Sequence, residues 1–175
     1  WSYPFGELLV RAAMALDVAP LVIPALFVVM VRTLNEVLYE TYDTHFLGPG
    51  LGYRAGSGAL FDLTTGALRP DGWTSATASG LPIFPGLARY EDVARGRIDH
   101  ALRFTVQDTR RAYVWPARHV ASDKTDADLP PMGMRFRLKK SYPIAGFPRQ
   151  ARIVLQALKE YGMIVSDNGS NWYVS

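Results

Sequence analysis

The chain of 175 residues contains no cysteine. Disulfide bonds, thiolate metal sites and cysteine nucleophiles are therefore excluded. A concentrated basic run is also missing, because the 19 Lys and Arg residues are scattered among 16 Asp and Glu residues and give a net charge of only +3. Nucleic-acid binders more often gather their basic residues on one helix or stripe, so we expect no nucleic-acid partner.

No apolar run is long enough to cross a membrane as a helix. The longest, residues 18–31, is interrupted by Pro20 and Pro24, whereas a spanning helix needs about 20 apolar residues. We therefore expect a buried segment there and no membrane span. The chain also opens on Trp1 without a charged leader region, and we expect it to lack part of its native N-terminal portion.

The composition that is present, 49% hydrophobic and 12% aromatic, is typical of a globular protein. Residues 100–106 alternate between apolar and polar, which predicts a half-buried strand, and Pro148 and Gly162 bracket a predicted helix. We predict one mainly β (α+β) domain over residues 1–175. It would be an antiparallel β-sandwich-like or barrel-like fold with one C-terminal helix packed on the sheet.

Short runs rich in β-branched and aromatic residues predict the remaining strands. They lie at 27–31, 36–45, 58–63, 67–69, 111–115 and 134–138. At the C-terminal end, Asn168 and Gly169 predict a tight turn that returns an aromatic strand beside the apolar one before it. Residues 70–86 form a long irregular stretch, and such loops are commonly functional or held by their own packing.

The candidate catalytic residues are His119, Arg118 and His100. His119 follows Arg118 at the end of an aromatic strand, where both could face a cleft, whereas His100 shares the apolar face of its strand. With His45, these histidines have no metal-ligand spacing, so we predict no metal and no cofactor. Carboxylates could complete an acid–base pair. The acidic candidates are Asp62, Asp71, Glu91, Asp92 and Asp99.

The candidate ligand-binding residues are Trp73, Ser75 and Trp115. An aromatic ring supplies a flat apolar platform, and nearby hydroxyl groups supply oriented hydrogen bonds, which together suit a sugar. The same aromatic residues more often fill a β core or fix a loop. The sequence leaves both interpretations open.

Seven blocks of sequence carry a resemblance to a known family. They are AGSGALFDL at 55–63, LRPDGWTSA at 68–76, GLPIFPGL at 80–87, HALRFTV at 100–106, YVWPARH at 113–119, LPPMG at 129–133 and YGMIVSDNGSNWY at 161–173. Together they resemble a family of secreted bacterial and fungal proteins of unassigned function. The match covers about residues 37–174, and residues 1–36 match poorly. The resemblance implies an extracellular or cell-surface location and supplies no catalytic residues.

Three functions remain open, and with them the question whether the protein is an enzyme. The first is an exported β domain with a binding or structural role, such as carbohydrate recognition or assembly with itself or with other surface proteins. The alternative is a polysaccharide-directed hydrolase with a cleft formed by His119, Arg118, His100 and a carboxylate. The third is a subunit of a larger complex. Converging titratable groups would favour the hydrolase, and an exposed aromatic shelf would favour the binding module.

Overall fold

The computed structural model describes residues 27–32 and 36–175, and for residues 27–32 only the backbone. The chain divides into two compact units, Trp1–Leu68 and Arg69–Ser175. Both are rich in β-sheet with few helices, as predicted, and the described strands form no closed barrel. None of the helices in the described part of the chain has the length and apolar character needed to span a membrane. The burial predicted for residues 18–31 lies outside what the structure describes, which begins at residue 27 and gives only the backbone of residues 27–32.

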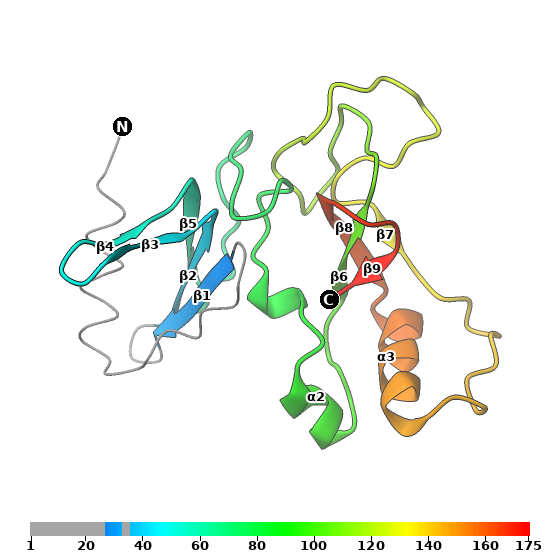
Figure 1. The fold of residues 1–175 in the computed structure, drawn as a ribbon. Coiled ribbons are helices and arrows are strands. Elements are labelled where there is room, and N and C mark those ends of the chain that lie inside the picture. The colour runs from blue at the N-terminus through cyan, green and yellow to red at the C-terminus, as the bar shows by residue number, and fades with distance from the viewer. Residues whose placement is uncertain (1–26, 33–35) are drawn as a thin grey trace. The chain divides into compact units, whose positions relative to one another are not determined.

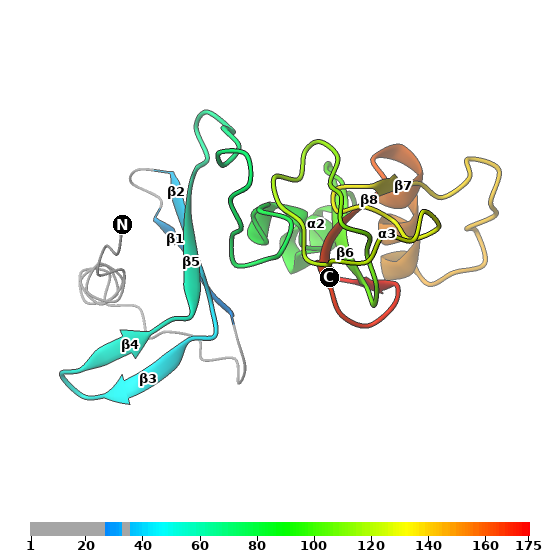
Figure 2. The ribbon, with the colours of Figure 1, turned by 90° about the horizontal axis from the view of Figure 1, so that it is seen from above.

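The first unit is built on a three-stranded antiparallel sheet in the order β1-β2-β5. Its strands are β1 (Phe27–Arg32), β2 (Val37–Tyr42) and β5 (Ser57–Asp62). A hairpin of β3 (His45–Gly48) and β4 (Gly52–Arg54) projects from this sheet (Figures 1 and 2). The strands predicted at 27–31 and 36–45 are thus present, although the second ends earlier because the chain turns at Asp43 into the hairpin, with φ of +53°.

The strand predicted at 67–69 is absent. The carboxylate of Asp62 accepts hydrogen bonds from the backbone N and the Oγ1 of Thr64, at 2.8 and 2.5 Å, and these bonds lower the pKa of Asp62. They close a local turn just after β5, and the residues that follow lie exposed without pairing to a strand. The chain therefore turns after β5, but no second strand follows the turn and no hairpin forms.

The second unit contains a four-stranded mixed sheet in the order β7-β8-β6-β9. Its strands are β6 (Leu102–Val106), β7 (Arg135–Phe136), β8 (Met163–Asn168) and β9 (Tyr173–Val174). Strand β6 runs parallel to β8 and antiparallel to β9. The prediction of a purely antiparallel domain is therefore wrong for the β6–β8 pair. The alternation predicted for residues 100–106 is confirmed, because Leu102, Phe104 and Val106 are all buried.

The predicted C-terminal hairpin is wrong, because β8 and β9 do not pair with each other but lie on opposite sides of β6. The side-chain amide of Asn168 donates to the carbonyl oxygens of Val106 and Gln107, which ties the end of β8 to the end of β6. The chain then crosses over, and the backbone N of Trp172 donates to Thr105. A type I′ turn would require a positive φ at Asn168, but in this segment it is Trp172 that has the left-handed backbone conformation, with φ of +59°.

The strand predicted at 111–115 is reduced to a single bridge between Tyr113 and Met132. The reason lies two residues further on, where Trp115 precedes a cis Pro116 and the chain turns back, with the N of Ala117 donating to the carbonyl of Val114 at 3.0 Å. A proline has no N–H to continue a ladder. The partners of β6 come instead from the C-terminal part of the chain.

The helices in the described part of the chain are α2 (Tyr90–Arg95), α3 (Arg149–Glu160) and a 3₁₀ turn (Phe84–Gly86). Helix α3 starts directly after Pro148. At its other end the guanidinium of Arg137 donates to the carbonyl oxygens of Lys159 and Glu160, both at 2.6 Å. These are carbonyl groups that a helix end leaves without a partner. Ala157 of α3 shares a buried cluster with Leu102 of β6 and Ile98.

A buried carboxylate organises α2. Asp92 is 1% exposed, and it accepts hydrogen bonds from Arg89 at 3.0 and 3.2 Å and from Arg95 at 2.8 Å. Burial by itself raises the pKa of Asp92, but the hydrogen bonds and positive charge of Arg89, with His100 and Arg95, lower it overall. Asp92 therefore stabilises the fold above the pKa that it has in the unfolded chain, and this contribution is lost as the pH falls through the lower folded value.

We predict that the double variant Arg89→Gln/Arg95→Gln loses about 3–5 kcal/mol of unfolding free energy at pH 7, because it leaves a buried carboxylate without its cations. Asp92→Asn should cost less, since the two half-exposed arginines can then turn to water. Urea unfolding measures both, and Arg97→Gln, which breaks only an exposed pair with Asp99, is the matched control. A double variant as stable as that control would contradict the prediction.

Candidate functional site

Arg118 holds the first part of the loop that carries Trp73. Its Nε donates to the carbonyl of Arg69 at 3.0 Å, and its Nη2 lies 3.2 Å from Oδ1 of Asp71. Its own carbonyl accepts a hydrogen bond from the N of Gly72 at 2.7 Å. Three polar contacts therefore fix residues 69–72 to the side chain and the backbone of Arg118.

Tyr113 joins the same group from a different segment. Its hydroxyl forms a hydrogen bond with the Asp71 carboxylate, and this bond raises the pKa of Tyr113, with burial acting in the same direction. Asp71 thus lies between a phenol and the guanidinium of Arg118, yet its side chain remains 63% exposed. A carboxylate held in this way still offers oxygen lone pairs to a molecule in solution.

His119 and Asp167 hold the second part of the loop, because both contact the backbone of Ala78. Nδ1 of His119 lies 3.0 Å from the Ala78 carbonyl oxygen. The N of Ala78 donates to Oδ1 of Asp167 at 3.4 Å. A carbonyl oxygen can only accept, so the geometry assigns the proton of the neutral imidazole to Nδ1 and leaves a lone pair on Nε2. Among the described residues, Nε2 of His119 has no hydrogen-bond partner.

Asp167 has an elevated proton affinity. Burial raises its pKa, and the opposing effects, which are hydrogen bonds from the backbone of Ala78 and Asn168 and the positive charge of Arg103, do not reverse that direction. Asp167 lies opposite Thr105 in the β6–β8 pairing. A carboxyl group with a raised pKa, which contacts the same residue as His119 does, is the sort of group that active sites employ.

Three buried hydroxyl groups fill the interior of the loop. Ser75, Thr77 and Ser79 are each at most 3% exposed. The hydroxyls of Ser75 and Thr77 both donate to the carbonyl of Leu81, at 2.8 and 3.1 Å. Ser75, predicted to bind a ligand, therefore has its hydroxyl engaged inside the loop and lies away from the surface.

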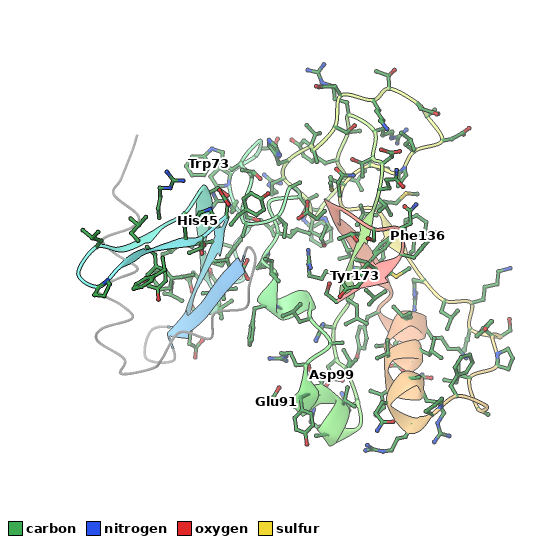
Figure 3. All side chains as sticks on the ribbon, in the orientation of Figure 1. His45, Trp73, Glu91, Asp99, Phe136 and Tyr173 are labelled. Atoms are coloured by element: carbon green, nitrogen blue, oxygen red, sulfur yellow. The ribbon has the colours of Figure 1, made fainter. Side chains whose placement is uncertain are left out.

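Trp73 and Trp115, the other two predicted ligand-binding residues, are at the surface. Their side chains are 57% and 74% exposed. Trp73 lies on the irregular loop and not on a strand (Figure 3), and the guanidinium of Arg69 stands 5.3 Å from its ring centroid. Trp115 occupies the turn that runs from Val114 to Ala117, immediately before Arg118. Both rings therefore project from segments that Arg118 joins.

The neighbouring Gly133 allows the turn that presents Trp115. It has φ of +81°, and a Cβ atom there would lie 2.0 Å from the carbonyl oxygen of Val114 and 2.8 Å from the Cβ of Ala117. Any side chain would push the turn away. The position of Trp115 is thus set by close backbone packing.

His100 does not belong to this group. It precedes β6, whereas Asp167 lies opposite a residue near the other end of that strand. Its Nδ1 contacts the carbonyl of Ala101 at 3.0 Å, and its buried Nε2 lies 3.7 Å from Asp92, without a hydrogen-bond partner in the described part of the chain. The structure brings Arg118 and His119 together at the loop and places His100 beside Asp92 of α2.

Two members of the site have no specific signal in the sequence. Asp71 is one of five acidic candidates, and Asp167 directly precedes the Asn168–Gly169 pair that predicts a turn. Their partners Arg118 and Ala78 are far away along the chain, and no local pattern links them. Within the described residues, no three His, Asp or Glu side chains gather in a way that could hold a metal ion.

Comparison with protein-family models, with curated proteins and with solved structures finds no match to this chain. The class defined by the fold and the site is a sheet-rich protein whose second unit displays two tryptophans from loops fixed by charged and polar side chains.

We predict that Asp167→Asn changes how stability depends on pH. Because the folded pKa of Asp167 is raised, the protonated acid favours folding, and that contribution is lost as the pH rises above the unfolded pKa and through the folded value. Asparagine keeps the carbonyl acceptor and cannot ionise, so the variant should gain stability relative to the wild type between about pH 4 and pH 7. Urea unfolding across this range tests it, and parallel curves for the two proteins would refute it.

Proposed function

We propose that the protein is a carbohydrate-binding module that uses Trp73 and Trp115 as its sugar platform. The observation that carries the proposal is the contrast between the polar side chains of the site, which contact the protein, and its tryptophans, which are exposed to solvent. Arg118 and His119, two of the three side chains predicted to be catalytic, hold the loop, while the two tryptophans remain 57% and 74% exposed.

The chemistry of the exposed groups suits a sugar. A pyranose ring presents a face of C–H groups that packs on an indole, and its hydroxyl groups need donors and acceptors at the rim. Asp71 supplies an accessible carboxylate, and Arg118, which is 25% exposed, supplies a guanidinium beside it. Because Arg118 and His119 fix the loop at several points, little conformational freedom is lost when a ligand binds.

We further propose that this module is exported and acts outside the cell or at the cell surface, as the resemblance in sequence implies. Binding to other surface proteins or to a second copy of the chain belongs to the same proposal. We also propose a sandwich-like domain in which α3 packs on the sheet, supported by the buried cluster that Ala157 forms with Leu102.

A second candidate function, a polysaccharide-directed hydrolase, is favoured by one observation. His119 and Asp167 contact the same residue, Ala78, and burial raises the pKa of Asp167. A raised carboxyl pKa suits a general acid, and the Nε2 lone pair of His119 suits a base. Most glycosidases use two carboxylates across the bond, and Asp71 would be the candidate for the second.

We predict that Trp73→Ala and Trp115→Ala each weaken binding to the recognised polysaccharide about tenfold or more, as removal of a central aromatic anchor does in other complexes. Affinity electrophoresis against soluble β-glucan, xylan and mannan identifies the ligand, and calorimetry measures the loss. The matched control is Tyr90→Ala, because Tyr90 is an aromatic residue on α2 that is 82% exposed. Equal weakening in the control, or no retardation on any polysaccharide, would refute the proposed platform.

We expect the same polysaccharides to be bound without cleavage. Reducing-end assays after prolonged incubation should show no product from the wild-type protein. If product does appear, and if His119→Gln and Asp167→Asn abolish it while leaving the affinity unchanged, the hydrolase replaces the binding module as the function of this site.

A further inference from the structure

A pocket of about 360 Å³ lies beside α3 in the second unit, away from the tryptophan site. Four residues of α3 line it, together with one residue from the loop before this helix and one from the end of α2. They are Arg149, Arg152, Ile153, Gln156, Ile144 and Gly96. Helices α2 and α3 contact each other (Figure 1), so the pocket is built from two helices and a loop.

The helix geometry explains why these side chains converge. Arg149, Arg152, Ile153 and Gln156 are spaced by three, one and three residues, which places them on one face of a helix. Gly96 closes α2 in a left-handed conformation with φ of +92°, and a Cβ atom there would lie 3.7 Å from Nη2 of Arg149. The missing side chain therefore leaves room in front of that guanidinium.

The two arginines of the pocket differ from four other arginines of this unit. Arg89, Arg95, Arg97 and Arg118 each face a carboxylate. Arg149 and Arg152 are exposed and have no ion pair or side-chain hydrogen bond with any described residue. The carboxylate of Glu160 on the same helix is turned to Gln156, whose Nε2 donates to it at 2.5 Å. Two guanidinium groups at one pocket are therefore available to an external anion.

We propose that this pocket binds a small organic anion, with its carboxylate, sulfate or phosphate group held by Arg149 and Arg152 and its uncharged body against Ile144 and Ile153. A guanidinium donates two parallel hydrogen bonds to an oxyanion. The volume of the pocket lies within the range of small-ligand sites. This inference rests on residues that the sugar platform does not use, and it stands or falls independently of the proposed function.

The test is a ¹H–¹⁵N NMR titration of the full chain with four ligands that share a sugar body: glucuronic acid, glucose 6-sulfate, glucose 6-phosphate and uncharged glucose. We expect at least one of the three anions to shift the amide signals of Gly96 and of the first turns of α3, and glucose to leave them unchanged. The anion with the lowest Kd identifies the preferred oxyanion. Binding should weaken as NaCl rises from about 50 to about 500 mM, because the pocket is open to solvent.

Variants decide whether the arginines are responsible. Arg149→Gln and Arg152→Gln should each raise the Kd about tenfold or more, with circular dichroism showing that the fold is retained. The matched control is Arg111→Gln, which removes an exposed arginine, 68% accessible and 3.8 Å from Asp123, outside the pocket. The proposal is overturned if no anion shifts these signals at about 20 mM, if glucose shifts them equally, or if the double variant Arg149→Gln/Arg152→Gln binds as the wild type does.

Discussion

The constraint on which the second unit depends is that the buried backbone of an irregular loop must find hydrogen-bond partners. Residues 75–81 are largely buried, yet they belong to no helix and no strand. A buried N–H or carbonyl group left alone costs about 1–3 kcal/mol. His119 and Asp167 meet that need at Ala78 from distant parts of the chain. The backbone N of Arg118 donates to the carbonyl of Ser79, and the carbonyl of Ser166 accepts from the N of Ser79. Two of the three residues that look most catalytic in the sequence, Arg118 and His119, therefore hold this loop in place.

The same dependence on distant partners limits how much of the fold and of the site can be predicted from the sequence. The alternation of residues 100–106 reports burial along a single strand, and such local information predicted β6. Strand pairing is not local, so an Asn-Gly pair suggested a hairpin where β8 and β9 instead flank β6. Arg118 and His119 could be placed together because they are adjacent, whereas the separation of His100 from them follows from where α2 and β6 lie. The exposure of Trp73 and the burial of Ser75, two residues apart, had no sequence signal at all, and the family resemblance stays a prediction.

The tryptophan site and the pocket beside α3 differ in what they can offer a ligand. At the loop, every charged group contacts protein, so recognition there must draw on exposed aromatic surface and on the free lone pairs of Asp71. At α3, the guanidinium groups of Arg149 and Arg152 have no described partner, while the apolar contribution is limited to Ile144 and Ile153. A neutral ligand therefore suits the first site and a charged one the second. The two proposals differ in their dependence on salt, because only the second pairs exposed charges of the protein with a charged ligand.

The buried carboxylate of Asp92 and the half-buried carboxylate of Asp167 have opposite pKa shifts, so the stability of this architecture depends on pH. Asp92 is stabilised as an anion by two arginines and contributes stability that is lost as the pH falls through its low folded pKa. Asp167 is stabilised as a neutral acid by burial, and its contribution is lost as the pH rises through its high folded pKa. Taken together, these two groups favour folding most near the ordinary carboxyl pKa of about 4. Only Asp167 lies beside the candidate site, where it anchors Ala78. Protonation of Asp167 therefore stabilises the fold at the point where the loop that carries Trp73 is attached, whereas ionisation of Asp92 stabilises the region around α2.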